Sequence, residues 1–198
     1  MKSVIQAIPI PSGALINRHL PGADFQDCYA APIEPDSPSA LAIFLVVAAR
    51  TPGWVNRLMS IRNHLVTMFG LKNLGHLNAI NASKSAGDYR VGDRVGIFTI
   101  EAMHDDEVIL GDSDKHLDVK VSVCKVNDAA RPLLAITTVV QTHNLLGRVY
   151  MAFVAPMHRR IVPATLARLE QGQNATRRQT GASPKNTRAT ARIGNVPA

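Results

Sequence analysis

Four side chains that can bind a metal ion or transfer a proton lie close together near the middle of the chain. They occupy alternate positions as Asp112, Asp114, His116 and Asp118. On an extended strand, alternate residues project to the same side, so the spacing predicts that Asp114, His116 and Asp118 share one face. Carboxylate and imidazole groups arranged in this way can hold a metal ion, or can act as general acid and general base on a carbonyl substrate.

The same spacing also fits a plain amphipathic strand. Between His116 and Cys124, the apolar residues Leu117, Val119 and Val121 alternate with polar ones. Such alternation is typical of an antiparallel sheet with one face in the core and the other in water, and it explains the polar positions without any site. We therefore predict no metal and no cofactor here, and keep His116 and Asp118 as candidate ligand-binding residues.

Three further candidates lie on or next to predicted helices. His143 precedes Asn144 at a strand–helix junction, where it can orient a ligand while Asn144 caps the helix. Trp54 can stack on a ligand, although a single tryptophan also serves as a core anchor. Arg62 can reach an anionic ligand or extend its charged end into water.

The last predicted helix supplies the remaining candidates. Tyr150, Phe153 and Met157, together with Met151 and Val154, would line any cavity between this helix and a sheet. Methionine suits adaptable apolar contacts, but a well-packed core uses the same residue types. The sequence leaves cavity and packed core as alternatives.

Several common chemistries have no support in the sequence. It contains no G-x-S-x-G nucleophile motif and no glycine-rich phosphate or dinucleotide loop. Cys28 and Cys124 are far apart, which fits two free thiols in a reducing compartment rather than a disulfide framework. The longest apolar run, residues 40–49, is shorter than the roughly 20 residues that span a bilayer, and no secretory signal is evident. We therefore expect a cytoplasmic protein.

The net charge of +7 is unevenly distributed. Residues 172–198 carry five basic and no acidic side chains, and the part before them has a net charge of +2. This tail contains no aromatic residue that could stack on bases, so we expect a solubilising extension rather than a nucleic-acid site, with contact to a membrane surface as an alternative. The basic residues 158–160 are interpreted as a solvated helix face.

The positions of the proline and glycine residues predict three regions. Residues 1–24 form an irregular entry segment on the surface, residues 25–171 one α+β domain, and residues 172–198 a flexible basic tail. The domain begins with a strand over 25–33 near a sheet edge. Two helices follow, one starting with Pro38 at its first position and ending at Arg50, the other over 54–69 with Gly70 as its C-cap. Residues 71–93 are expected to form a long loop.

The second half of the domain is predicted to be an antiparallel meander followed by a long helix. The expected strands cover residues 95–102, 107–111, 116–124 and 133–143. The helix begins after Asn144, and Pro156 and Pro163 should kink or break it because each removes a backbone hydrogen bond. This makes about five strands in all.

Several short segments together resemble the bacterial family of proteins of unknown function numbered 2867. The resemblance covers about residues 21–169. The segments are Arg50–Trp54, Arg62–Asn63, Gly92–Asp93, Val108–Asp112, Lys115–Asp118, Thr142–Asn144 with Gly147, Arg148 and Tyr150, and Pro156–His158. The resemblance implies no activity, but it implies a START-like (SRPBCC) helix-grip fold, in which a curved antiparallel sheet wraps around a long C-terminal helix, and it implies a possible dehydrogenase partner.

Three functions follow as hypotheses. The first is a binding module that holds a small apolar or amphipathic molecule between sheet and C-terminal helix. The second is an enzyme of the polyketide cyclase type that acts on a carbonyl substrate with His116, Asp118 or His143 as base, which requires these groups to face a cavity. The third is an interaction protein that accompanies a dehydrogenase or a membrane surface.

Overall fold

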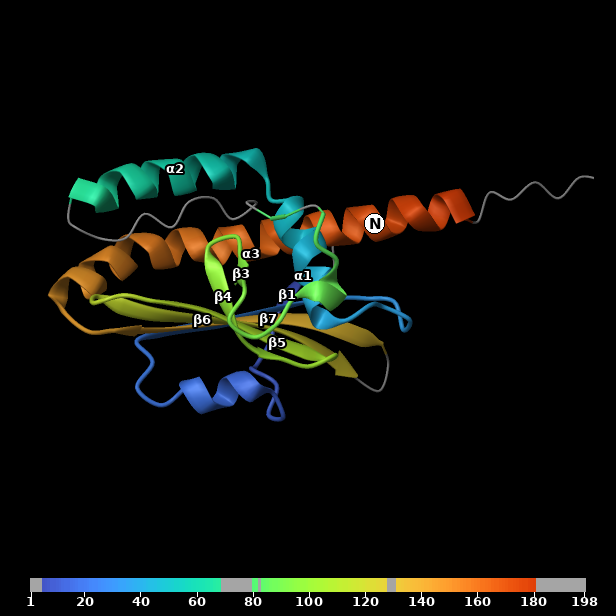
Figure 1. The fold of residues 1–198 in the computed structure, drawn as a ribbon, viewed down its shortest axis with the longest axis horizontal. Coiled ribbons are helices and arrows are strands. Elements are labelled where there is room, and N and C mark those ends of the chain that lie inside the picture. The colour runs from blue at the N-terminus through green and yellow to red at the C-terminus, as the bar shows by residue number, and fades with distance from the viewer. Residues whose placement is uncertain (1–4, 69–79, 82, 128–130, 181–198) are drawn as a thin grey trace, which may run out of the picture.

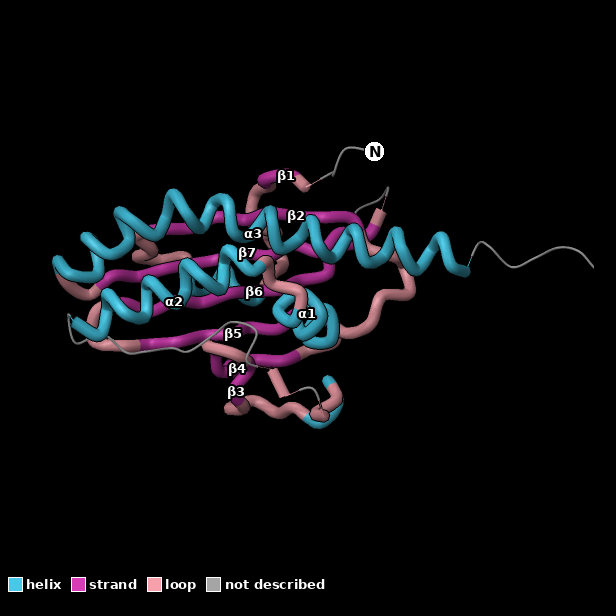
Figure 2. Tube along the Cα trace, turned by 90° about the horizontal axis from the view of Figure 1, so that it is seen from above, coloured by secondary structure: helices cyan, strands magenta, loops and turns pink. Residues whose placement is uncertain are grey.

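The protein is an antiparallel sheet with helices packed on one face. The computed structural model describes residues 5–68, 80–81, 83–127 and 131–180, and for residues 61–68 and 170–180 it describes the backbone only. The seven strands follow the order β1-β2-β7-β6-β5-β4-β3. Helices α1, α2 and α3 lie on one side of the sheet, and the short helix η1 lies on the other (Figure 1). The view from above shows α3 and α2 running along the strands (Figure 2).

The elements confirm the predicted α+β class and its order. In chain order they are β1 (Gln6–Ala7), η1 (Leu15–His19), β2 (Phe25–Pro32), α1 (Ala40–Ala49), α2 (Gly53–Met68), η2 (Ala86–Asp88), β3 (Arg94–Val95), β4 (Phe98–Met103), β5 (Glu107–Ser113), β6 (Leu117–Asn127), β7 (Pro132–Thr142) and α3 (Leu145–Thr180). β2 lies next to the edge, as predicted, because only the two-residue β1 pairs outside it. The expected C-cap at Gly70 lies outside the described residues.

Two short strands were missing from the prediction. β1 lies in the segment expected to be irregular, and β3 was merged with β4 into one strand over 95–102. The merged strand is wrong because the chain reverses at Gly96, which has a φ of 58°. Glycine adopts positive φ without the steric cost that a side chain would add, so β3 and β4 form a tight antiparallel hairpin.

Local capping sets the start and end of α1. The side chain of Ser39 accepts a hydrogen bond from the backbone N–H of Ala42 at 3.3 Å, so Ser39 is the N-cap and Pro38 lies outside the helix. The prediction of Pro38 in the first helical position is therefore wrong. At the other end, the Thr51 hydroxyl donates to the Ala48 carbonyl at 2.7 Å and satisfies one of the last free acceptors of the helix.

The C-terminal helix remains continuous through both of its prolines. α3 extends from Leu145 to Thr180, with Pro156 and Pro163 inside it, so of the predicted kink or break the break is wrong, and the kink stays a prediction. Each proline leaves the carbonyl four residues earlier without its helical partner. These carbonyls belong to Ala152 and Arg159, which are both solvent-exposed residues, so water can hydrogen-bond there.

The main core lies between the inner face of the sheet, which faces the helices, and α1 and α3. Residues alternate along each strand, so β6 presents Leu117, Val119, Val121 and Val123 to this side. Leu166 of α3 is fully buried among them. Burial of apolar side chains on this face supplies the main stabilisation of the domain.

The outer face of the sheet is also partly covered, by the entry segment. Ile16 of η1 is fully buried and packs with Ile109, Cys124 and Val139 in a second, smaller cluster. The expectation that β6 has a purely polar outer face therefore holds only at its N-terminal end. Ser122 is completely buried here, whereas Asp118 is partly exposed.

A buried carboxylate fastens the entry segment to the sheet. Glu107, 6% exposed, accepts hydrogen bonds from the backbone N–H groups of Leu15 at 2.6 Å and Ile16 at 3.3 Å, and from the Ser122 hydroxyl at 2.6 Å. Burial and the neighbouring Glu107 carboxylate raise the pKa of the Cys124 thiol to about 12. Cys124 is consequently a neutral packing residue at physiological pH, and it and Cys28 are free thiols, as predicted.

We expect Glu107→Gln to destabilise the protein by about 1–3 kcal/mol, because an amide nitrogen then faces backbone N–H donors in a buried site. Urea unfolding followed by circular dichroism measures this loss. The matched control is Glu101→Gln, which weakens only the surface pair with Lys120 and should cost less than about 1 kcal/mol. Equal effects of the two substitutions would contradict the role assigned to Glu107.

Candidate functional site

An apolar cavity lies between the inner face of the sheet and the helices. Its volume is about 200 Å³. The apolar side chains of its wall come from all three helices, from the β3–β4 hairpin and from the central strands, among them Phe44, Val55, Phe98, Val121, Ile136, Val154 and Val162. We call this space the inner cavity.

A few polar side chains also line the inner cavity. They are Asp112, Asp114, Thr138, Tyr150, His158 and Thr165. The described lining contains two carboxylates and no lysine or arginine. The polar wall is therefore acidic, which disfavours an anionic ligand.

One histidine of this lining is paired with a buried carboxylate. His158 Nδ1 lies 2.9 Å from Asp27 Oδ2, and the Asp27 side chain is only 9% exposed. His158 Nε2 lies 3.4 Å from the hydroxyl of Thr138, and the Phe25 ring meets the imidazole edge-on with 5.7 Å between ring centroids. A carboxylate that contacts one imidazole nitrogen can orient the ring as an acid–base group, and His158 lines the cavity.

The sequence interpretation missed this pair. His158 was assigned with Arg159 and Arg160 to a solvated helix face, and that assignment is wrong for His158, whose side chain is 21% exposed. A signal was available, since His158 follows Met151 and Val154 at spacings of seven and four, which places all three on one helix face. Nothing local connects Asp27 with His158, because 131 residues separate them.

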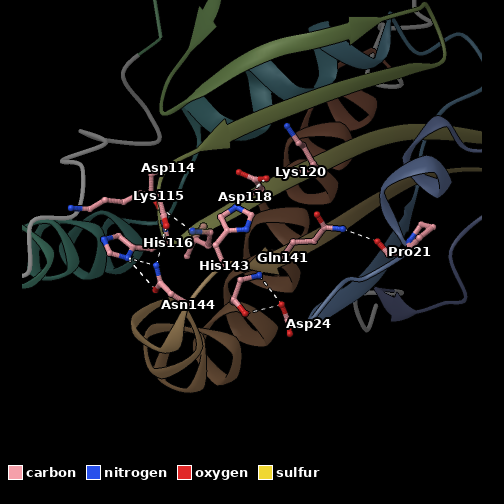
Figure 3. A network of polar contacts seen from close by, with 12 residues as sticks. Pro21, Asp24, Asp114, Lys115, His116, Asp118, Lys120, Gln141, His143 and Asn144 are labelled. Atoms are coloured by element: carbon pink, nitrogen blue, oxygen red, sulfur yellow. Dashed lines mark hydrogen bonds and ion pairs between the residues drawn. The ribbon is translucent and has the colours of Figure 1, made fainter.

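The junction between β7 and α3 is fixed by polar contacts between residues 115–116 and 143–147 (Figure 3). The Asn144 side chain accepts from the Gly147 N–H at 3.1 Å and so caps α3, as predicted, and its amide donates to the Lys115 carbonyl at 3.0 Å. His116 Nδ1 lies 3.1 Å from Asn144 Oδ1, and the His143 N–H donates to the His116 carbonyl at 2.8 Å. These contacts tie the start of α3 to the β5–β6 turn.

The predicted row of Asp114, His116 and Asp118 on one face is wrong. Asp114 lies in the β5–β6 turn, where its carboxylate accepts from the N–H groups of His116 at 2.7 Å and Leu117 at 3.0 Å. His116 is buried in the same turn, and Asp118 points to the outer face of β6. The turn breaks the strand geometry on which the alternation argument depended.

His143 and Asp118 pair with each other on the solvent side of the sheet. His143 Nε2 lies 3.2 Å from Asp118 Oδ2, and their side chains are 41% and 30% exposed. Partial burial raises the pKa of Asp118, but hydrogen bonds from Ser113 and His143 outweigh this effect and leave the pKa below its usual value. Neither residue, nor His116, belongs to the described lining of the inner cavity.

The other predicted ligand-binding residues divide between the cavity and the surface. Tyr150 lines the inner cavity, whereas Trp54, Phe153 and Met157 are 43%, 73% and 38% exposed. The neighbours Met151 and Val154 line the cavity in their place. Arg62 lies on α2, and its side chain is outside the described residues.

An exposed apolar stripe runs along α3. Leu145, Val149, Phe153 and Met157 follow at intervals of four residues and all face solvent. Exposed large apolar residues in a row are unusual on a soluble surface and mark places of contact. We call these four residues the α3 stripe.

The fold and the cavity define a helix-grip-like α+β protein with a small apolar interior space. The chain belongs to the family described as Protein of unknown function (DUF2867), whose model matches residues 19–165. No curated protein and no solved structure shows significant similarity to the chain. The START-like relationship, the dehydrogenase partner and the three-region division stay predictions.

In the part of the chain that the structure describes, no group of three or more histidine, cysteine, aspartate or glutamate side chains is placed to hold a metal ion. Within the same part, no helix combines the length and the apolar character needed to cross a bilayer.

We expect Gly147→Ala to destabilise the protein by about 1–3 kcal/mol, because a Cβ at this position would collide with the carbonyl oxygen of His116 and force α3 away from the β5–β6 turn. Chemical unfolding measures the effect. Gly53→Ala is the control, since a Cβ there meets nothing within 4 Å. If Gly147→Ala is as stable as this control, the close approach at the junction is not a constraint.

Proposed function

We propose that this protein binds one small, largely apolar molecule in the inner cavity. The observation that carries the proposal is the partly open space of about 200 Å³ lined mainly by apolar side chains from the sheet and all three helices. Protein interiors are ordinarily packed with few voids larger than a water molecule, and an empty space costs stability. A space of this size in the centre of the fold supports a binding role.

The volume restricts the size of the ligand. Pockets for drug-sized molecules measure roughly 300–1,000 Å³, whereas an engineered apolar cavity of about 150 Å³ takes up benzene. The inner cavity, at about 200 Å³, therefore suits a molecule with a single ring or a short branched chain. Met59 and Met151 in the wall can adjust to ligands of different shape.

We expect toluene to bind the wild-type protein and to raise its thermal unfolding midpoint in a concentration-dependent manner, because a ligand that binds only the folded state stabilises it. Val154→Trp should abolish binding by filling the cavity from α3. The matched control is Val149→Trp on the exposed α3 stripe of the same helix, which should bind toluene as the wild type does. Calorimetric titration measures the affinities.

The proposal fails if toluene and a library of small apolar compounds leave the wild-type protein unshifted. Native mass spectrometry of protein purified from its own cell adds an independent readout, since it detects a molecule that co-purifies. Binding that persists unchanged in Val154→Trp would place the ligand elsewhere on the protein.

A second candidate function is contact with an anionic membrane surface through the α3 stripe. Three arginines, Arg148, Arg159 and Arg160, are exposed on the same helix, and residues 145–169 contain no acidic side chain. An apolar stripe flanked by arginines is typical of helices that lie in the membrane interface. Each basic residue near an anionic surface contributes about 1 kcal/mol.

We expect the protein to co-sediment with vesicles that contain phosphatidylserine and to do so less with vesicles of phosphatidylcholine alone. Phe153→Glu should reduce the bound fraction several-fold, because it places a negative charge within the α3 stripe. Val91→Glu, which changes another exposed apolar residue outside α3, is the control. Equal sedimentation of all three proteins would remove this candidate.

A further inference from the structure

We infer that His158, held by Asp27, is the hydrogen-bond acceptor that selects the ligand of the inner cavity, and that this ligand is a neutral molecule with an apolar body and a hydroxyl group, such as a phenol. The inference rests on the proposed function, because it requires a ligand in this cavity. It adds the chemical class of that ligand and the groups that recognise it.

The first step concerns the orientation of the imidazole. Asp27 Oδ2 lies 2.9 Å from His158 Nδ1, and an ionised carboxylate can only accept a hydrogen bond. Nδ1 therefore carries a proton, and in the neutral imidazole Nε2 presents its lone pair. The edge-on contact with Phe25 holds the ring in this position. Asp27 acts here as a positioning residue.

The second step concerns what meets Nε2. The Thr138 hydroxyl, 2% exposed, lies 3.4 Å away, which is long for a hydrogen bond from a hydroxyl group. His158 and Thr138 both line the inner cavity. A ligand hydroxyl placed between them can donate to Nε2 and accept from the threonine, and both bonds can then reach normal length.

The third step concerns charge. Besides His158, the ionisable lining consists of Asp112, Asp114 and Tyr150, and Asp27 lies directly behind the imidazole. A carboxylate ligand would bring another negative charge into a largely apolar space that already has acidic neighbours. A neutral hydroxyl group meets the acceptor without this penalty.

The fourth step separates a functional from a purely structural role. Asp27 is nearly buried, and its second oxygen, Oδ1, has no hydrogen-bond partner among the described residues. Replacing both partners of a buried hydrogen bond by apolar groups of similar shape can be nearly neutral or stabilising. An incompletely satisfied Asp–His pair in the wall of an apolar cavity is therefore a feature that stability alone does not explain.

The test compares three probes of similar size on the full-length protein by calorimetric titration: phenol, toluene and benzoate. We expect phenol to bind about tenfold or more tightly than toluene, and benzoate to bind most weakly. A cavity without an acceptor gives the opposite order for the first two, because the phenol hydroxyl would lose its hydrogen bond to water without replacement.

The variant for this test is the double substitution Asp27→Leu with His158→Phe, which removes the acceptor and its carboxylate together and leaves no buried charge unpaired. It should bind toluene at least as tightly as phenol. His104→Phe changes an exposed histidine and should keep the wild-type preference. If the double variant does not fold, nitrogen-15 NMR of His158 in the wild-type protein tests the inference instead. We expect the Nδ1–H tautomer and a change in the chemical shift of Nε2 when phenol is added.

A separate measurement tests whether Asp27 positions the His158 imidazole. Asp27→Asn should change the His158 tautomer from Nδ1–H alone to a mixture and reduce the phenol preference, an effect that a structural role would not produce. A wild-type protein that binds toluene as tightly as phenol, or an Nε2–H tautomer, overturns this inference while the proposed function stands. If neither these probes nor the library of small apolar compounds binds, both fail.

Discussion

The structure depends on how the apolar inner face of the sheet is covered. β6 and β7 present valine, leucine and isoleucine side chains to this side, and α3 runs along the strands there, over β2 and β7. The position of α3 is set at its first turn, where Asn144 caps the helix and bonds to the β5–β6 turn, and where Gly147 allows the backbone of that turn to approach. Because the helix begins at a fixed point, the space beneath it is fixed as well.

The two faces of the sheet are covered by different segments of the chain. On the outer face, Glu107 fastens the entry segment through two backbone hydrogen bonds, and Ile16 fills the space below it. On the inner face, the helices cover the strands but leave a cavity of about 200 Å³. The entry segment thus covers the outer face, and the inner cavity lies on the helical side.

The residues that make the family recognisable mostly build this architecture. Lys115, His116, Asn144 and Gly147 meet at the strand–helix junction, and Gly92 adopts a φ of 94° before the β3–β4 hairpin. The acid–base pair at the cavity consists of His158, which lines it, and Asp27 directly behind the imidazole, and the two residues come from opposite ends of the domain.

The sequence by itself determined the α+β class, the order of the long elements and the Asn144 cap, because hydrophobic period and capping act over a few neighbouring residues. The sequence did not reveal the turn at Gly96. It also did not reveal that Asp114, His116 and Asp118 lie apart, because the β5–β6 turn changes the direction in which these side chains point. Only the tertiary structure brought Asp27 to His158 and turned Phe153 outward. Such pairings depend on strand register and helix position, which packing across the whole domain decides.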